Sequence, residues 1–360
     1  MKIGLVRRGY SSTGGAETYL LRLGGALQQA GHKLVLFSDE QWPAEAFEAE
    51  RLQPTQIVLE ARSPRLFADA VRAARPQVAC DFLLSLERVW ACDVYRAGDG
   101  VHGEWLRRRA AREPFWKPLF RKLQRKHTEL LALERALFTG GARAIIANSR
   151  MVKDEITAHF GTAAERIHVV HNGVPAWSAE PGERARKRAE LGLNEGDYAV
   201  LFAGSGWERK GLRYAIAAMD SVPGTLLIAG RGKTRARSER ARFLGPQDRS
   251  AMHALLAAAD AFVLPTLYEP FSNACLEALA AGLPVITTRA NGFAEIIEPG
   301  VEGEVIADPA DTAALARALA AWADPAKRAA IRAPLLGKGA AYSIEANVRR
   351  TLEVIERCSR

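Results

Sequence analysis

Residues 268–286 read Tyr-Glu-Pro-Phe-Ser-Asn-Ala-Cys-Leu-Glu-Ala-Leu-Ala-Ala-Gly-Leu-Pro-Val-Ile. This stretch predicts a loop, a short apolar helix that stops at Gly282, and a buried strand from Val285. Ser272 is the expected N-cap, so the free N–H groups of the first turn should face an anionic or hydroxyl-rich ligand. Glu277 lies among apolar residues, where an unpaired buried charge is costly, and we expect a polar partner that could be a ligand. A rim-exposed glutamate on an amphipathic helix is the alternative.

The chain of 360 residues is long for one hydrophobic core, and two domains are expected. Hydrophobic residues make up 48% of the chain, which supports globular folding. The first residues run into a strand pattern without signal-peptide features, and no apolar run is long enough to span a bilayer, which together predict a cytoplasmic protein. The cysteines lack metal-ligand or redox spacing and are expected to be reduced: Cys80, Cys92, Cys275 and Cys358.

The formal net charge of +9 has one prominent source, the segment between Trp105 and His127. Nine basic residues lie there beside a single acid, Glu113, with aromatic and apolar residues between them. This mixture suits an anionic membrane surface, where charge attracts and rings insert at headgroup depth. A solvated helix face is the alternative, and no nucleic-acid-binding motif accompanies the segment. The residues expected to dock are Trp105, Arg107, Arg108, Arg109, Phe115, Trp116, Lys117, Arg121 and Lys122.

The first half of the chain begins with a strand–helix–strand pattern. A strand at 3–6 and a glycine loop precede a helix that stops at Gly31, and a second strand follows at 33–37. This order predicts a parallel sheet that binds its ligand at the carboxyl ends of the strands. Gly14 and Gly15 could approach a phosphate, but the wider glycine fingerprint of an NAD site is missing.

The same rhythm restarts after a charged stretch, punctuated by proline and glycine, at about 175–197. A buried strand at 198–203 runs into a glycine-bounded loop at 204–211, and a helix follows the loop. Further strand patterns lie at 78–84, from 93 into a polar loop, and at 144–149, 167–170, 226–229, 261–264 and 285–287.

Two such βα domains in tandem should face each other across a cleft. We expect the first domain at 1–173 and the second at 174–339. The amphipathic segment 340–360 is expected to return and pack on the first domain.

Arg209 and Lys210 lie in the loop before the second domain's first helix. Two fixed cations at that place are suited to neutralise a diphosphate, with solvated surface charge as the alternative. Two carboxylates spaced Glu-x7-Glu, Glu269 and Glu277, should face this loop. Carboxylates accept hydrogen bonds from sugar hydroxyls, so one acid could hold a ribose and the other a hexose. The combination is more specific than either part.

Four motifs carry a resemblance to a known family: the acid pair at 269–277, Gly-Gly-Ala-Glu at 14–17, Asn-Gly-Val at 172–174 and Arg-Lys-Gly at 209–211. Together they resemble the retaining family-4 nucleotide-sugar glycosyltransferases, over most of the chain. The resemblance implies an α/β protein of GT-B fold, with two Rossmann-like βαβ domains facing across a cleft. Within the family, the segments at 93–99 and 204–211 look similar to the lipopolysaccharide core glucosyltransferases, which add the first outer-core glucose to heptose.

The resemblance implies a role for each matching residue. Glu277 would bind the donor ribose and Glu269 the transferred sugar, while Arg209 and Lys210 would stabilise the leaving diphosphate in place of a metal. Asp99, or else His102, would lie near the anomeric carbon and the acceptor. The catalytic candidates are Asp99, His102, Arg209, Lys210 and Glu269; the donor-binding candidates are Gly14, Gly15, Gly204, Ser205, Arg209, Lys210, Glu269, the backbone of Phe271, Ser272 and Asn273, and Glu277; the acceptor-side candidates are Glu17, Asp99 and His102.

The expected reaction is a retaining, metal-independent transfer of a hexose, foremost glucose from UDP-glucose, to a membrane-bound glycolipid such as lipopolysaccharide core heptose. No further cofactor and no nucleic acid partner are implied, and the enzyme would sit peripherally on the anionic cytoplasmic face of the inner membrane. A mannosyl- or heptosyltransferase with a GDP- or ADP-linked donor, and a GT-B UDP-N-acetylglucosamine epimerase, remain as alternatives. A nucleic-acid-binding module is the alternative from another class.

Overall fold

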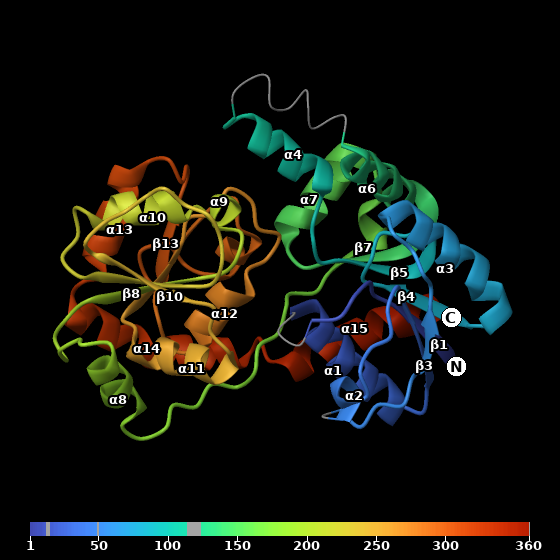
Figure 1. The fold of residues 1–360 in the computed structure, drawn as a ribbon, viewed down its shortest axis with the longest axis horizontal. Coiled ribbons are helices and arrows are strands. Elements are labelled where there is room, and N and C mark those ends of the chain that lie inside the picture. Colours follow the sequence, from blue (N-terminus) through green and yellow to red (C-terminus); the bar gives the residue numbers. More distant parts are fainter. Residues whose placement is uncertain (12–14, 49, 114–123, 360) are drawn as a thin grey trace. The chain divides into compact units, whose positions relative to one another are not determined.

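The computed structural model describes residues 1–11, 15–48, 50–113 and 124–359, and the chain divides into two compact units (Figure 1). Unit 1 comprises Met1–His171 together with Glu345–Arg360, and unit 2 comprises Asn172–Ile344. Each unit has its own parallel sheet with helices packed around it. The chain therefore leaves unit 1 once, completes unit 2, and returns.

The described part of unit 1 contains a parallel sheet in the order β3-β2-β1-β4-β5-β6-β7. The strands are β1 (Lys2–Val6), β2 (Lys33–Ser38), β3 (Thr55–Val58), β4 (Phe82–Ser85), β5 (Cys92–Ala97), β6 (Ala142–Ala147) and β7 (Ile167–Val169). The helices are α1 (Gly15–Gln29), α2 (Glu45–Glu48), α3 (Pro64–Val78), α4 (His102–Ala110), α6 (Arg125–Ala136), α7 (Arg150–Phe160) and α15 (Ile344–Ser359), with a π-helical turn at Leu137–Gly141 and a 3-10 turn at Ala164–Arg166.

The core of unit 1 is formed by strands whose side chains are buried on both faces, as a helix-covered parallel sheet requires. The helix predicted after the glycine loop is confirmed as α1, with Leu20, Leu23 and Leu27 buried. The strand predicted at 78–84 is wrong in its first half, because Val78 ends α3 and the left-handed Ala79 forms its C-cap. A short apolar run can continue a buried helix as well as a strand, so its pattern did not separate the two.

The final helix, α15, completes unit 1. Its side chains Val348, Val354 and Ile355 are buried. Asn347 Nδ2 donates a hydrogen bond to the carbonyl of His171, and the hydroxyls of Tyr19 and Thr351 lie 3.1 Å apart. Residues from the two ends of the chain thus share one hydrogen-bonded and apolar interface.

The described part of unit 2 contains a parallel sheet in the order β10-β9-β8-β11-β12-β13. The strands are β8 (Ala199–Ala203), β9 (Thr225–Ala229), β10 (Ala241–Gly245), β11 (Ala261–Leu264), β12 (Val285–Thr288) and β13 (Gly303–Ile306). The helices are α8 (Glu183–Glu190), α9 (Trp207–Lys210), α10 (Leu212–Met219), α11 (Arg249–Ala258), α12 (Asn273–Ala280), α13 (Thr312–Ala321) and α14 (Pro325–Ala340), with a 3-10 turn at Gly292–Ile296. The strands predicted at 198–203, 226–229, 261–264 and 285–287 are confirmed within a residue or two.

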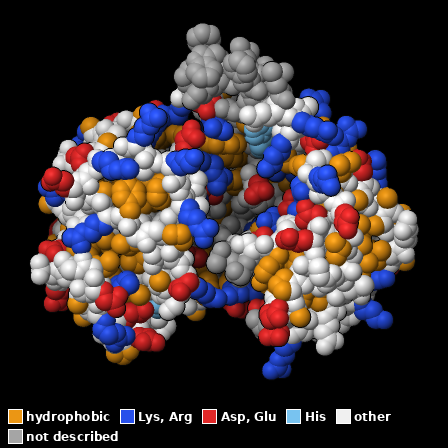
Figure 2. All heavy atoms as spheres, viewed as in Figure 1, with side chains coloured by type: hydrophobic (Ala, Val, Ile, Leu, Met, Phe, Trp, Pro, Cys, Tyr) orange, Lys and Arg blue, Asp and Glu red, His pale blue; other side chains and the backbone are white. Residues whose placement is uncertain are grey.

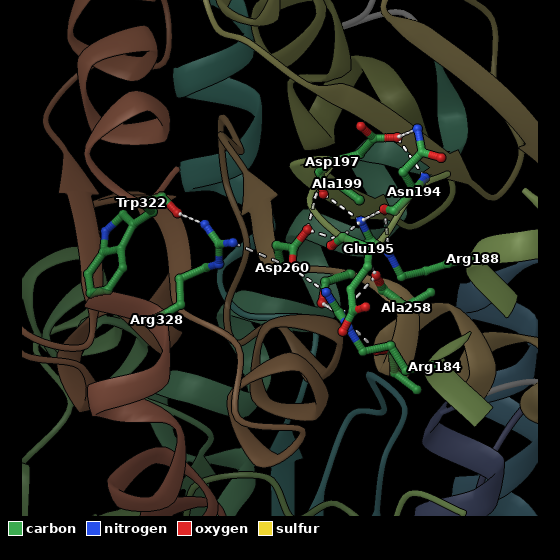
Figure 3. A network of polar contacts seen from close by, with 12 residues as sticks. Arg184, Arg188, Asn194, Glu195, Asp197, Ala199, Ala258, Asp260, Trp322 and Arg328 are labelled. Carbon is green, nitrogen blue, oxygen red and sulfur yellow. Dashed lines mark hydrogen bonds and ion pairs between the residues drawn. The ribbon is translucent and has the colours of Figure 1, made fainter. Parts of the chain in front are cut away.

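One buried acid organises the amino-terminal edge of the unit 2 sheet (Figure 3). Asp260 lies just before β11; it accepts a hydrogen bond from the Ala199 N–H at 2.8 Å and pairs with Arg184 at 2.6 Å and Arg188 at 3.2 Å. Arg184 also donates to the carbonyl at the C-terminus of α11, at Ala258, where a cation complements the helix dipole. This network lies at the edge opposite the strands' carboxyl ends, so we assign it to stability and not to ligand binding.

Candidate functional site

The loops after β8, β11 and β12 leave the same edge of the unit 2 sheet, because these strands are parallel neighbours. Arg209, Lys210 and Glu269 come together there. Glu269 is only 8% exposed; its Oε2 pairs with Lys210 Nζ and lies 3.5 Å from an Arg209 guanidinium nitrogen. The Lys210 side chain is 12% exposed and that of Arg209 is 37% exposed. The site thus combines one buried carboxylate with two cations, one of them partly open to solvent.

The backbone around the two cations is fixed by hydrogen bonds to a neighbouring loop. The Arg209 carbonyl accepts from the Leu267 N–H at 2.8 Å and from the Thr266 hydroxyl at 2.9 Å. The loop predicted at 204–211 contains a short helix, α9, bounded by Gly206 and Gly211, which both have a positive φ. The pattern predicted a loop because a turn of four helical residues is too short to show periodicity.

The two other predicted residues of this loop sit just before α9. The Gly204 N–H donates to the carbonyl of Ala229 at 3.0 Å, and the exposed Ser205 accepts from the Arg231 N–H at 3.4 Å. The loops after β8 and β9 are therefore linked by hydrogen bonds. This link gives α9 a defined starting point at the sheet edge.

The predicted N-cap of α12 is confirmed, since the Ser272 hydroxyl accepts from the Cys275 N–H at 3.2 Å. The Ser272 N–H itself donates to Asn291 Oδ1 at 3.2 Å and is not left for a sugar hydroxyl, contrary to our expectation. Among the described residues, no acceptor is found for the first-turn N–H groups of Asn273 and Ala274. Phe271 is buried in the same turn. The first turn of α12 therefore keeps two N–H groups that a ligand could use.

Asn291 is a residue of this site that no sequence motif indicated. It is 1% exposed; besides Ser272, its Oδ1 accepts from the Phe293 N–H at 3.1 Å, and its Nδ2 donates to the Thr287 hydroxyl at 3.0 Å. The adjacent Glu269 N–H donates to the carbonyl of Ala290. Asn291 thus fixes both the turn before α12 and the segment beside Glu269. Nothing in its local sequence distinguishes it from a loop asparagine.

Glu277 lies on α12, half-buried among core residues of the helix. Burial raises the pKa of its carboxyl to about 6, against the attraction of the Arg249 charge. We find no hydrogen bond or ion pair to its carboxylate from the part of the chain that the structure describes. The polar partner that we expected for Glu277 is therefore not found among the described residues. Arg249 acts on the Glu277 carboxylate only through its charge.

The predicted acceptor-side residues of unit 1 occupy two different environments. Glu17 is 5% exposed and pairs with Arg7 at 2.9 Å, and Arg7 also pairs with Glu87 at 2.6 Å. Asp99 follows β5; its carboxylate is 74% exposed and lies 3.8 Å from Arg88. Glu17 is thus committed to an ion pair, whereas Asp99 is open to a ligand. Gly15 begins α1, and Gly14 lies outside the described residues.

His102 begins α4, and its Nε2 lies 2.9 Å from Nδ1 of His127. Burial and the nearby charge of Arg88 lower the pKa of His102 to about 4, so its imidazole is neutral at pH 7. Glu134 accepts from the Gly103 N–H at 3.0 Å at the start of α4 and pairs with the buried Arg88 at 3.2 Å. Arg88 and Glu134 are separated in sequence from Asp99 and His102, and no local pattern indicated that they belong together.

The described part of the predicted docking segment carries paired charges. Glu104 pairs with Arg107 and Arg108 at 2.6 Å, Arg108 also pairs with Glu155 at 2.8 Å, and Arg109 pairs with Glu113 at 2.9 Å. Trp105 is half-buried. Lys and Arg side chains also lie elsewhere on the surface in view, with Asp and Glu side chains among them (Figure 2). The predicted docking residues Phe115, Trp116, Lys117, Arg121 and Lys122 lie outside the described residues.

Two features are absent from the described residues, a membrane-spanning helix and a metal-binding cluster. No helix in them is both long and apolar enough to cross a membrane. They also contain no cluster of three or more His, Cys, Asp and Glu side chains arranged to hold a metal ion. The four cysteines are free thiols, and burial raises the pKa of Cys275, in α12, to about 12.

Two family descriptions match the chain, one on each half. Residues 13–176 match Glycosyltransferase Family 4, and residues 197–324 match Glycosyl transferases group 1. The chain belongs to glycosyltransferase family 4. Its two parallel sheets form the GT-B fold of this family.

Several known proteins are similar to this family-4 glycosyltransferase. The lipopolysaccharide glucosyltransferase WaaG of Escherichia coli is 26% identical over 322 residues, 83% of each chain. An uncharacterised glycosyltransferase of Methanocaldococcus jannaschii is 31% identical over 177 residues, which are 44% of this chain and 45% of that protein. The match thus spans less than half the length of the archaeal relative.

Solved structures give the same fold for this family-4 glycosyltransferase. The crystal structure of WaaG superposes with a TM-score of 0.81 at 23% identity, over 98% of this chain and 99% of that one. HepE of Anabaena in complex with UDP-glucose superposes with a TM-score of 0.75 at 19% identity, over 99% of this chain and all of that one.

Proposed function

We propose that the chain is a retaining glycosyltransferase that moves a hexose, namely glucose from UDP-glucose, onto a sugar of a membrane-bound glycolipid such as lipopolysaccharide core heptose. The observation that carries this proposal is the cluster of Glu269 with Arg209 and Lys210 at the carboxyl edge of the unit 2 sheet. The similarity to WaaG supports the acceptor class, and the HepE complex supports UDP-glucose as donor. The enzyme would work peripherally at the cytoplasmic face of the inner membrane.

Unit 2 would bind the donor through its charged cluster. Arg209 and Lys210 would take the diphosphate, a role for which the partly open guanidinium and the ammonium group are suited. Once the phosphates share these cations, the Glu269 carboxylate can accept hydrogen bonds from hydroxyls of the transferred sugar. The two N–H groups at the start of α12, on Asn273 and Ala274, would add donors to the same sugar.

Glu277 would hold the ribose. Its carboxylate lacks a protein partner among the described residues, and a pair of vicinal hydroxyls would supply the hydrogen bonds that a half-buried carboxylate requires. The ribose would thus be the polar partner that Glu277 lacks among the described residues.

The transfer step would join the acceptor oxygen to the anomeric carbon as the bond from that carbon to the phosphate oxygen breaks. The leaving diphosphate would take the proton of the acceptor hydroxyl, and Arg209 and Lys210 would stabilise the charge that develops on it. No metal is required for this charge neutralisation. The exposed Asp99 would orient the acceptor, whereas the neutral His102, hydrogen-bonded to His127, holds no acidic proton at pH 7 to donate.

The proposal is tested with nucleotide sugars and truncated lipopolysaccharide cores. Lys210→Ala and Glu269→Ala should each lower the transfer rate by at least about a hundredfold while far-UV circular dichroism stays unchanged. The exposed Glu298 offers a matched control, and Glu298→Ala should keep full activity. Full activity of Lys210→Ala or Glu269→Ala would contradict the proposed site.

The donor is identified by comparing UDP-, GDP- and ADP-linked sugars in the same assay. UDP-glucose should give transfer and the largest thermal stabilisation of the protein. If only a GDP- or ADP-linked sugar supports transfer, the proposed glucosyltransferase activity is wrong, and a mannosyl- or heptosyltransferase activity takes its place. Release of UDP from UDP-N-acetylglucosamine without any acceptor would indicate an epimerase.

A further inference from the structure

A second basic segment, in the loop after Ala229 that we expect to lie near Arg209 and Lys210, connects β9 to β10 in unit 2. Between residues 231 and 242 one acid, Glu239, accompanies six basic residues. All seven of these charged residues are exposed. The six basic residues are Arg231, Lys233, Arg235, Arg237, Arg240 and Arg242. We call this segment, together with the adjoining Phe243, the 231–243 surface.

The cations of the 231–243 surface are not paired with acids of the described part of the chain. None of the six forms an ion pair with any residue that the structure describes, in contrast to Arg107, Arg108 and Arg109 on α4. Three of the six donate hydrogen bonds to backbone carbonyls, which stiffens the segment: Arg237 to Ala236, Arg240 to Gly224 and Arg242 to Leu191. The side chains of Arg231, Lys233 and Arg235 have no partner within the described residues.

An aromatic ring is exposed beside these cations. Phe243 is 41% exposed although it lies in a strand. It packs against Trp207 with ring centroids 5.6 Å apart, and the guanidinium carbon of Arg237 lies 5.8 Å from its ring centre. Gly232 also lies against Trp207, because a side chain there would meet the indole at 2.6 Å. The exposed ring therefore lies beside Arg237, within the same segment as the other five cations.

We propose that the 231–243 surface docks unit 2 on an anionic lipid bilayer. Unpaired cations gain most from lipid phosphates because no internal ion pair has to be broken first. The exposed part of Phe243 can enter the headgroup layer, as aromatic side chains do at membrane interfaces. A nucleic acid is the weaker fit, since Trp207 and Arg237 already contact the ring on which a base would stack.

The test is flotation of the full chain with two kinds of vesicle, one of phosphatidylcholine alone and one in which phosphatidylglycerol replaces part of it. The wild-type chain should float with the anionic vesicles only. Lys233→Gln combined with Arg235→Gln should weaken this binding by about thirtyfold. Each basic residue near an anionic surface contributes about 1 kcal/mol, and about 1.4 kcal/mol corresponds to a tenfold change in affinity. The matched control is Arg317→Gln with Arg350→Gln, which removes the same charge from exposed positions on α13 and α15 and should float as the wild type does.

Other outcomes separate this surface from its competitors. Unchanged flotation of the Lys233 and Arg235 double variant contradicts the proposal, and a loss only in Arg107→Gln, Arg108→Gln, Arg109→Gln assigns docking to α4 instead. Weaker UDP binding with intact flotation would make these cations part of the donor site and also overturns it. The proposal is also contradicted if the chain still binds single-stranded oligonucleotide at a salt concentration that releases the vesicles. Flotation needs no turnover, so failure of the transferase assay does not affect this result.

Discussion

At the scale of single residues, Glu277 gives the clearest prediction, which rests on its proposed role with the ribose. Its pKa is about 6, and only the ionised carboxylate accepts hydrogen bonds from two hydroxyls. Affinity for UDP-glucose should therefore rise about tenfold between about pH 5 and about pH 7. UDP-glucose is the right probe because, unlike UDP, it has no terminal phosphate that titrates near pH 6. Isothermal calorimetry without acceptor measures the profile.

Glu277→Gln is the control for that profile. It should bind UDP-glucose more weakly at neutral pH, and its affinity should not change through about pH 6. The free protein gives an independent readout: a raised pKa means that the folded state holds this proton more tightly than the unfolded state. The free energy of unfolding contributed by Glu277 then falls as pH rises toward 6, and Glu277→Gln should remove this loss. A profile that persists in Glu277→Gln would exclude this residue as its source.

At the scale of elements, α9 depends on the two glycines that bound it. Gly206 and Gly211 have nearly the same φ, 75° and 76°, but only at Gly211 would a side chain collide, 1.9 Å from the carbonyl oxygen of Pro265. Gly206→Ala should cost about 1 kcal/mol of unfolding free energy through backbone strain alone. Gly211→Ala should cost about 3 kcal/mol more, because two backbone segments must separate.

Urea unfolding of the two glycine variants measures the difference. Gly211→Ala should also weaken UDP binding, because displacement of α9 moves Arg209 and Lys210, whereas Gly206→Ala should retain most of it. Equal stability of the two variants would show that the contact with Pro265 does not constrain α9.

The elements also mark how far sequence reasoning reaches. The buried strands and α12 with its Ser272 cap follow from periodicity and capping, which are local properties of the chain. Asn291 and Glu134 could not be found in this way, because each acts on residues distant in sequence. The docking segment was predicted from its basic and aromatic residues. The acids Glu104 and Glu155, which pair with its arginines, lie outside the window of 105–127 in which charges were counted.

At the scale of the whole molecule, each unit has its own core, and a defect in one should stay local. Asp260→Ala removes the only acid that pairs with the buried Arg188 among the described residues, so it should destabilise unit 2 by about 3–5 kcal/mol. Ile355→Asp places a charge at a position that is 2% exposed in α15 and should destabilise unit 1. Hydrogen exchange should rise in β8 and β11 for the first variant, and in α1 and α15 for the second.

Spread of faster exchange through both units in either variant would contradict this division. Arg317→Gln, at an exposed position in unit 2, serves as the control and should leave exchange unchanged throughout.

The return of α15 to unit 1 has a consequence for the order of events during synthesis. Unit 2 is a continuous stretch, Asn172–Ile344, and all of its described strands are synthesised before the last helix. Unit 1 begins first, yet its Val354 and Ile355 arrive last. Unlike a continuous N-terminal domain, unit 1 can therefore be completed only after unit 2 has been synthesised. Until α15 is made, Tyr19 on α1 lacks Thr351 and the carbonyl of His171 lacks Asn347, so docking of α15 is the step that completes unit 1.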